Sequence, residues 1–358
     1  MYYQKIKNKI ELAIKSLKSG KNVIVTDDKN RENESDLILP GQIADTEKIS
    51  FMLQYTSGFL CLSVTEDYVK KLNLFSMYFS KKSKNTELTS PIFTMIESSK
   101  NITTGISARD RATTIRVASN KNVVLDDINQ PGHIPLLLAN KTGVFGRRGH
   151  TEGSTDLVKI AGFNPVSALS ELVNPNGSIM KDKNIFEFSS THNLPCVSIE
   201  DIFLYRLYNE VLLSKKDDKI ISLEDYGNIL ITNFKDHLLN LKITVVSKII
   251  SENPEVHIVS PLFFNDLSKL FEKKINRRSQ LHKILRSLSS HGGIAIYFNL
   301  SSRDRMRLSE LSKNNLYYCS IMQVLKYYNI NEYKIFPDFL NLNIIEYYSE
   351  RLDFQINK

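Results

Sequence analysis

The residues most able to do chemistry form an acidic run between positions 26 and 40. Five carboxylates gather there around Arg31, namely Asp27, Asp28, Glu32, Glu34 and Asp36. Crowded carboxylates repel one another, so they remain together only where a cation or a proton stabilises the set. Because oxygen ligands suit hard divalent ions, the run predicts a Mg²⁺ or Mn²⁺ site. The alternative is a solvated acidic turn in which Arg31 is the internal ion-pair partner.

Two further polar segments offer groups that could bind or transform a ligand. In 103–116, Gly105 permits an unusual backbone angle, and its neighbours offer hydroxyls and amides that suit a phosphate or a polyol, namely Thr103, Thr104 and Ser107. Asp110 and Arg111 could equally form a structural ion pair there. In 130–135, His133 lies in a predicted turn bounded by Pro and Gly. A lone histidine in such a turn fits either a catalytic or a structural role.

Segment 145–162 has the features of an anion site. Its polar members are Arg147, Arg148, the amides near Gly149, His150 and Thr151. They precede a helix that we expect to begin near Glu152, and a helix N-terminus with positive side chains attracts anions. His150 also offers a nitrogen ligand to a divalent metal. Further on, Glu171 follows an apolar segment and precedes a turn.

The elements that must position these groups alternate between strands and helices. In the first half we expect an amphipathic helix ending at Gly20, strands at 23–25, 37–40, 58–65 and 92–98, and helices at 46–55, 65–74 and 198–213. The polar segment 76–89 is predicted to be a loop. The second half has a helix at 278–290 and strand-like segments at 229–234, 241–246, 256–261, 293–300 and 333–336. The pattern predicts an α+β chain with mixed α/β layers.

The length of 358 residues allows two domains of ordinary size. We predict domains at 1–213 and 220–358, joined by a linker at the charged segment 214–219. The alternative reading of that segment is an exposed helix end inside one domain.

Composition limits the partners and the compartment. The formal net charge is +8, but the positive residues are spread out and no aromatic residues alternate with Arg, so we expect no nucleic-acid partner. No apolar run approaches the ~20 residues that span a bilayer, and the N-terminus lacks the apolar core of a signal peptide. We therefore expect no membrane partner. Cys61, Cys196 and Cys319 are scattered, which predicts neither disulfides nor a cysteine zinc site and favours the cytoplasm.

Five motifs in order give the first half a family resemblance: "DDKNRENESDLI", "TTGISARDRATTIR", "PGHIPLLLA", "RRGHTEGSTDLVKIAGF" and "ELVNPNGS". Over nearly all of 8–206 the chain resembles 3,4-dihydroxy-2-butanone 4-phosphate synthase of riboflavin biosynthesis. The resemblance implies that family's fold and the conversion of D-ribulose 5-phosphate into L-3,4-dihydroxy-2-butanone 4-phosphate and formate. It further implies a homodimer with active sites near the subunit interface, two Mg²⁺ or Mn²⁺ ions in each site, and no organic cofactor.

The resemblance also assigns roles to residues. It implies the metal ligands Glu32 and His150, and the catalytic residues Glu32, Asp36, His133 and Glu171. It implies substrate contacts from Arg31, Glu32, Asp36, Thr104, Arg147, Arg148, Gly149, His150, Thr151 and Glu171. Enolisation, water loss, skeletal migration and formate release need several proton donors and acceptors, so we expect one small site to gather Glu32, Glu34, Asp36, His133 and Glu171. Ser35 replaces the family's usual Gly and would be strained if that position required a positive φ.

The second half resembles GTP cyclohydrolase II at 279–300 and 320–336. The resemblance implies zinc held by three cysteines, but this half contains only Cys319, and the expected nucleotide loop reads "SSRDRMRL". Because catalytic zinc needs about three protein ligands, we predict a smaller α/β domain of that fold without zinc or cyclohydrolase activity. The histidines are too dispersed for a substitute site: His237, His257, His282 and His291. The alternatives are a bifunctional enzyme that also hydrolyses GTP, and a regulatory module that binds RNA or protein.

Overall fold

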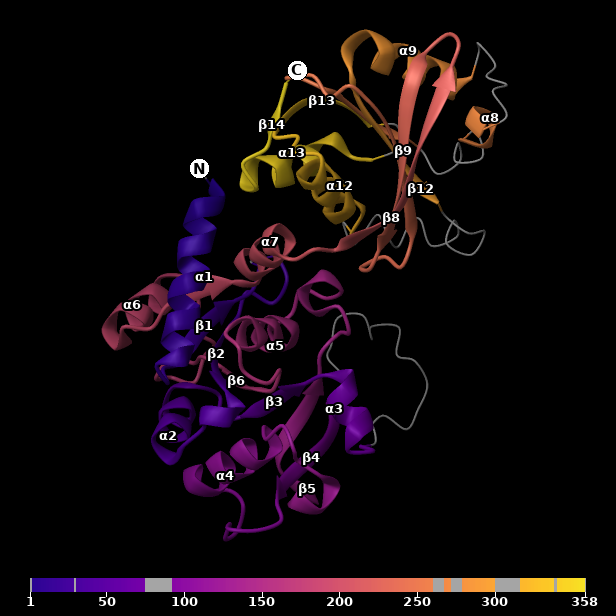
Figure 1. The fold of residues 1–358 in the computed structure, drawn as a ribbon. Coiled ribbons are helices and arrows are strands. Elements are labelled where there is room, and N and C mark those ends of the chain that lie inside the picture. Colours follow the sequence, from indigo (N-terminus) through magenta and orange to yellow (C-terminus); the bar gives the residue numbers. More distant parts are fainter. Residues whose placement is uncertain are drawn as a thin grey trace. The chain divides into compact units, whose positions relative to one another are not determined.

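The computed structural model describes residues 2–28, 30–74, 92–259, 267–271, 279–299, 316–337 and 340–357. The chain forms two compact units, each with its own sheet (Figure 1). The N-terminal unit is Gln4–Tyr205, and the C-terminal unit is Arg206–Lys358 together with Met1–Tyr3. The two sheets with their helices confirm the mixed α/β layers expected from the sequence. Segments 76–89 and 301–308, predicted to be loops, lie outside the described residues.

The N-terminal unit is built on a mixed sheet whose described strands run in the order β4-β5-β3-β6-β2-β1-β7. They are β1 (Val23–Thr26), β2 (Ser35–Pro40), β3 (Cys61–Val64), β4 (Ile92–Ser98), β5 (Ile128–Leu138), β6 (Ser167–Glu171) and β7 (Cys196–Ser198). Strands β1 and β2 pair antiparallel, with Thr26 opposite Ser35. The acidic run is therefore the connection of this hairpin. On the other side of β2, Asp36 lies opposite Glu171 of β6.

Helices cover both faces of this sheet (Figure 1). On one face, apolar side chains of the sheet form a core with α2 (Thr46–Tyr55), α3 (Glu66–Lys71), α4 (Ala108–Ala118) and α6 (Lys183–His192). Because side chains alternate along a strand, Val25 points to the opposite face, where α5 (His150–Ile160) and α7 (Ile199–Asn209) pack. Helix α1 (Tyr2–Lys18) and the short 3-10 turns η1 (Gly41–Ile43), η2 (Leu125–Asp127) and η3 (Gly143–Phe145) complete the described elements of this unit.

Helix α5 lies buried along most of its length, with continuous burial from His150 to Val158. It contacts β1, β2, β3 and β6, so its first residue is fixed against the acidic hairpin. Close packing is possible at Gly153, where a Cβ would already touch Val25, Ile199 and Ile202. The predicted helix start near Glu152 is thus two residues late, since α5 begins at His150.

Two segments predicted to be ligand-binding loops are partly regular structure. The second part of 103–116 is helix α4, capped by Ser107, whose side chain accepts a hydrogen bond from the amide of Asp110. The turn expected at 130–135 is instead an irregular part of strand β5, which is held by pairing with β4. Residues 130–133 have no partner on β4, but the residues on either side, Asn129 and Ile134, are paired and keep them within the strand.

The C-terminal unit contains a second mixed sheet, with described strands in the order β14-β13-β11-β12-β10-β9-β8. They are β8 (Leu213–Leu223), β9 (Gly227–Asp236), β10 (Lys242–Lys248), β11 (Glu255–Val259), β12 (Gly293–Asn299), β13 (Glu332–Pro337) and β14 (Gln355–Ile356). The described helices are α8 (Ser268–Phe271), α9 (Gln280–His291), α12 (Leu316–Tyr327) and α13 (Leu342–Arg351). Helix α9 packs its apolar side against β10, β11 and β12. Within the described ranges, no helix has both the length and the apolar character to cross a membrane.

The linker predicted at 214–219 is wrong, because these residues lie in strand β8. Strand β8 pairs with β9 and forms the edge of the sheet. Charged residues are tolerated on an exposed edge strand and discourage pairing with other chains, and Lys215 forms an ion pair of 2.6 Å with Asp218. The division between the units falls between Tyr205 and Arg206 within α7, before the predicted boundary at 213.

Candidate functional site

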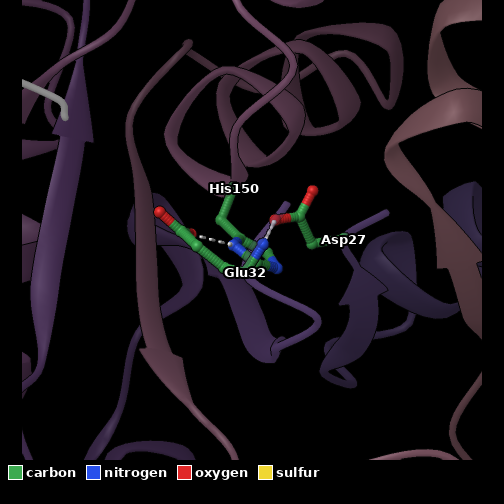
Figure 2. Close-up of side chains that lie close together, drawn as sticks. All are labelled: Asp27, Glu32 and His150. Atoms are coloured by element: carbon green, nitrogen blue, oxygen red, sulfur yellow. Dashed lines mark hydrogen bonds and ion pairs between the residues drawn. The ribbon is translucent and has the colours of Figure 1, made fainter. Parts of the chain in front are cut away.

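Asp27, Glu32 and His150 bring possible metal ligands together from distant parts of the sequence (Figure 2). One ligand atom from each side chain lies within 4.8 Å of the other two. Nδ1 of His150 is 3.9 Å from Oε2 of Glu32. Glu32 comes from the β1–β2 connection, while His150 is the first residue of α5. The packing of α5 on the sheet therefore joins the two residues that the sequence suggested as metal ligands.

The carboxylate of Asp27 organises the acidic connection around itself. Its Oδ2 accepts hydrogen bonds from Nη1 of Arg31 at 2.6 Å and from the amide of Glu32 at 3.2 Å. Arg31 also donates to Oε2 of Glu32 at 2.6 Å, so it bridges the two carboxylates. Asn33 takes the positive φ of 52° in this connection, whereas Ser35 is extended in β2. The strain considered for Ser35 therefore does not arise.

Asp36 and His150 face each other beside this group. Nε2 of His150 lies 3.9 Å from Oδ1 of Asp36, which is too long for a hydrogen bond. Both atoms are buried, and neither has a hydrogen-bond partner in the part of the chain that the structure describes. Buried polar atoms normally find a partner, and a divalent cation between a carboxylate oxygen and an imidazole nitrogen would provide it. Glu32 faces Nδ1 of the ring and Asp36 faces Nε2, so each nitrogen has a carboxylate with which it could share a Mg²⁺ or Mn²⁺ ion.

The carboxylates around Asp36 influence one another. Burial raises the pKa of Asp36 to about 7, assisted by Glu171, Glu34 and Glu32 and opposed by His150. Burial and the nearby charges of Glu32 and Glu171 also raise the pKa of Glu34. Oε2 of Glu171 accepts a hydrogen bond of 2.7 Å from the Ser57 hydroxyl. At neutral pH the cluster therefore contains a carboxyl group poised to take up or release a proton.

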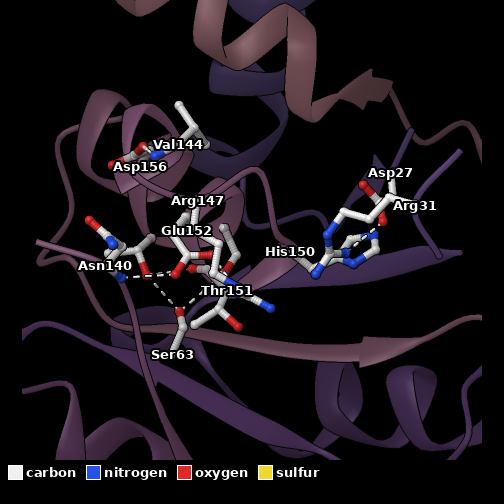
Figure 3. Close-up of polar contacts among 12 residues, drawn as sticks. Asp27, Arg31, Ser63, Asn140, Val144, Arg147, His150, Thr151, Glu152 and Asp156 are labelled. Carbon is white, nitrogen blue, oxygen red and sulfur yellow. Dashed lines mark hydrogen bonds and ion pairs between the residues drawn. The ribbon is translucent and has the colours of Figure 1, made fainter. Parts of the chain in front are cut away.

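The start of α5 is arranged differently from the anion site predicted from the sequence (Figure 3). Gly149 is the N-cap and supplies no side-chain cap. Nη1 of Arg147 donates to Oε2 of the buried Glu152 at 2.7 Å. Arg148 forms an ion pair with Glu200 and lies 3.4 Å from the ring centre of Phe203. Both arginines thus have carboxylate partners within the unit.

Thr151 is buried in the first turn of α5, directly after His150. Its carbonyl accepts hydrogen bonds from the hydroxyls of Ser154 and Thr155, at 3.1 and 2.8 Å. The hydroxyl of Thr155 also donates to Ser63 of β3 at 2.9 Å. This network ties the beginning of the helix to the sheet (Figure 3) and so fixes the position of the imidazole.

Within one chain His133 lies apart from the acidic cluster, whereas we expected one small site to contain both. It lies on β5 beside Glu97 of β4, with its Nδ1 3.0 Å from Oε2 of Glu97. In the sheet, β3 and β6 separate β5 from β2, which places these strands about 14 Å apart at the usual spacing. The exposed Thr104 precedes Gly105, whose Cβ, if present, would touch His133. Thr104 and His133 therefore form a second group.

Two residues of these groups were not singled out from the sequence. Asp27 stands beside Asp28 in the acidic run, and nothing in the residue types tells which of the two faces His150. Glu97 lies in an alternating strand pattern that gives no sign of a polar partner. The pairing of β4 with β5, which only the fold provides, brings Glu97 to His133.

The possible zinc ligands of the C-terminal unit contact protein groups, and two of the four histidines share one carboxylate. Cys319 is buried in α12. His282 contacts the hydroxyl of Tyr226, and His237 contacts that of Ser214. His257 and His291 both pair with Glu255.

The chain matches the family model for 3,4-dihydroxy-2-butanone 4-phosphate synthase over residues 11–205. The synthase of that name from Shewanella woodyi is 42% identical over 199 residues, which cover 55% of this chain and 90% of the relative. The one from Campylobacter jejuni is 32% identical over 337 residues, which cover 91% of each chain.

Solved structures give the same relationship. RibBX from A. baumannii, a two-domain 3,4-dihydroxy-2-butanone 4-phosphate synthase, matches with a TM-score of 0.69 and 26% identity, covering 98% of this chain and 99% of that one. A synthase solved in complex with two magnesium ions matches with a TM-score of 0.51 and 30% identity, over 55% of this chain and 95% of that one. These matches confirm the resemblance found in the motifs. The chain belongs to the 3,4-dihydroxy-2-butanone 4-phosphate synthase family.

Proposed function

We propose that the protein converts D-ribulose 5-phosphate into L-3,4-dihydroxy-2-butanone 4-phosphate and formate, a step of riboflavin biosynthesis. Family membership supports the reaction. The observation that carries the proposal in this chain is the cluster of Glu32, Asp36, His150 and Glu171, which three separate segments bring together where β2 begins and β6 ends. A reaction that moves protons among several oxygens needs such a collection of acids and bases.

Asp27, Glu32 and His150 are the residues that would hold a divalent metal, Mg²⁺ or Mn²⁺, with Asp36 facing the same imidazole. When bound, the ion would supply Lewis acidity toward the ketose carbonyl and its neighbouring hydroxyl. The two magnesium ions in the related synthase structure support two ions per site. We propose no zinc and no organic cofactor.

The residues of the chain itself would exchange protons with the substrate. Asp36 and Glu171 lie opposite each other on β2 and β6. Burial raises the pKa of Asp36 to about 7, so this carboxyl group can take up or release a proton near neutral pH. Arg31, held between Asp27 and Glu32, would orient hydroxyl or phosphate oxygens of the sugar. The amides at the start of α5, Gly149 to Thr151, suit a phosphate group.

The separation of His133 and Thr104 from the acidic cluster supports a homodimer in which each site combines two chains. In that arrangement Glu32, Asp36, His150 and Glu171 come from one copy, and His133 and Thr104 come from the other. A single chain would then hold two incomplete half-sites.

Formate release tests the reaction directly. Purified protein with ribulose 5-phosphate and Mg²⁺ should release formate, and EDTA should stop the release until Mg²⁺ is restored. Glu32→Gln should lower the rate at least about 100-fold while the melting temperature changes little, because this side chain is 44% exposed. Glu66→Gln is the matched control, because the Glu66 side chain is similarly accessible at 41%. Inert wild-type protein, or full activity in Glu32→Gln, would contradict the proposal.

For the C-terminal unit we propose a GTP cyclohydrolase II-like fold without cyclohydrolase activity. The absence of a cysteine triad supports this, since Cys319 is the one cysteine after residue 200. The protein should therefore release no formate from GTP, and metal analysis should find less than stoichiometric zinc. GTP-dependent formate release together with bound zinc would show a bifunctional enzyme. The free thiols Cys61, Cys196 and Cys319 support a reducing compartment, the cytoplasm.

A further inference from the structure

Glu97 is the carboxylate closest to His133, and the geometry points to a role that the family resemblance did not assign. We infer that Glu97 is a positioning residue, which holds the His133 imidazole in the tautomer protonated on Nδ1 and leaves Nε2 free to accept a proton. The inference rests on the proposed function, in which His133 takes part in the reaction.

The hydrogen bond between the two side chains determines the tautomer. Nδ1 of His133 lies 3.0 Å from Oε2 of Glu97. A carboxylate accepts hydrogen bonds and has none to donate, so the proton of this bond belongs to Nδ1. In the neutral ring Nε2 then keeps its lone pair. His133 is 41% exposed and Glu97 22%, so the ring can meet a substrate while the carboxylate stays behind it.

An irregularity between β4 and β5 creates this pair. Ile96 lies opposite Ile134, but the next residue, Glu97, lies opposite Asn129, so residues 130–133 of β5 are extra within the ladder. Extra residues in one strand bend it and redirect side chains. At Gly132 a Cβ would lie 2.1 Å from the carbonyl carbon of Ile96, so only glycine lets the bulge approach β4 this closely. The bulge therefore turns His133 onto Glu97.

Gly105 closes over the pair from a third segment. Its φ is +85°, and a Cβ there would lie 2.5 Å from Oε2 of Glu97 and 2.6 Å from Nδ1 of His133. The buried Asp110 fixes this loop, because its Oδ2 accepts hydrogen bonds from the amide of Gly105 at 3.1 Å and from the hydroxyl of Thr103 at 2.7 Å. Strands β4 and β5 and the loop at Gly105 thus surround the contact between His133 and Glu97. Such support fixes the orientation of the imidazole.

Nitrogen NMR on the folded protein with ¹⁵N-labelled histidine reads the tautomer without substrate. The His133 signals are assigned by their loss in His133→Asn. We expect the neutral ring to carry its proton on Nδ1 in the wild-type protein and to shift toward the Nε2-protonated form in Glu97→Leu, which removes the acceptor. A wild-type ring protonated on Nε2 would overturn the inference.

Kinetics provide the second readout. Glu97→Leu should lower kcat about 10- to 100-fold with KM for ribulose 5-phosphate nearly unchanged. Glu97→Asp should recover part of kcat, and the control Glu66→Leu should resemble the wild type. Unchanged kcat in Glu97→Leu would refute the positioning role while leaving the proposed function intact. If the wild-type protein releases no formate, the proposed function fails, whichever tautomer the spectra show.

Discussion

Gly105 is the residue on which the Glu97–His133 geometry depends most directly. Two separate physical effects exclude other residues from this position. The φ of +85° belongs to the left-handed region that L side chains rarely adopt, and a Cβ would press against both polar side chains. Gly162 offers a natural comparison, because its φ is +90° but nothing lies within 4 Å of its Cβ position. A substitution at Gly162 therefore measures the cost of backbone strain alone, whereas one at Gly105 adds the cost of a steric clash.

Gly162→Ala should lower the free energy of unfolding by about 1–2 kcal/mol, the cost of a left-handed backbone, and leave formate release unchanged. Gly105→Ala should cost a further ~1–3 kcal/mol through overpacking and should lower kcat as well. Urea unfolding and formate release of both variants check this. If the two variants lose the same stability, or if Gly105→Ala keeps the wild-type kcat, a Cβ at position 105 does not clash with Glu97 and His133.

At the residue scale, the sequence indicated many of the candidate site residues but not their grouping. Asp36, His150 and Glu171 were indicated by the family motifs that contain them, with Asp36 in the acidic run and His150 in the polar segment before a predicted helix. The choice of Asp27 over Asp28 depends on which carboxylate the hairpin turns inward. Glu97 had no local signal at all, since its partner His133 is brought beside it by a strand irregularity.

Helix α2 illustrates how one element is fixed at its first turn. Asp45 is its N-cap, and its Oδ1 accepts a hydrogen bond of 2.9 Å from the amide of Lys48. Partial burial acts to raise the pKa of Asp45, but the hydrogen bonds and charge of Lys48 outweigh it, so the pKa lies below its usual range. A carboxyl group whose folded pKa is depressed stabilises the fold above its unfolded pKa of about 4. That contribution is lost as the pH falls through the folded value.

Asp45→Ala should therefore lower the free energy of unfolding by about 1 kcal/mol at pH 7, and the difference from the wild type should shrink below about pH 4. Asp45→Asn is the matched control, because it keeps the cap and removes the charge. It should retain most of the stability at pH 7 and show a weaker pH dependence. Urea unfolding of the three proteins between pH 3 and 7 checks this, and a pH-independent deficit in Asp45→Ala would contradict it.

At the element scale, the sequence was most reliable where pattern and propensity agree. The helix at 46–55 and the strand at 92–98 were predicted with their observed bounds. The linker predicted at 214–219 failed because the pairing of β8 with β9 overrides local composition. The turn predicted at 130–135 is instead an insertion in β5, in which residues 130–133 have no partner on β4. Pro and Gly within β5 form a bulge, and the charges of β8 lie on an exposed sheet edge.

For the whole molecule, the order of motifs along the chain does not tell which of them meet in space. All five motifs belong to the N-terminal unit, yet the structure divides their polar groups between β2–β6–α5 and β4–β5. A closed homodimer uses the same surface on both copies. Two half-sites that are separated within one chain can therefore meet across such an interface, each from a different copy.

Mixing two inactive variants tests this arrangement. If Glu32 and His133 act from different copies, a heterodimer of Glu32→Gln and His133→Asn contains one site with both changes and one unchanged site. Random pairing makes half of the dimers mixed, so co-expression should restore about one quarter of wild-type activity. If both residues act within one chain, every site keeps one change and no activity returns. A site shared between two copies predicts about one quarter of wild-type activity from two inactive variants. Co-expressed protein that is as inactive as either variant alone would therefore exclude a shared site.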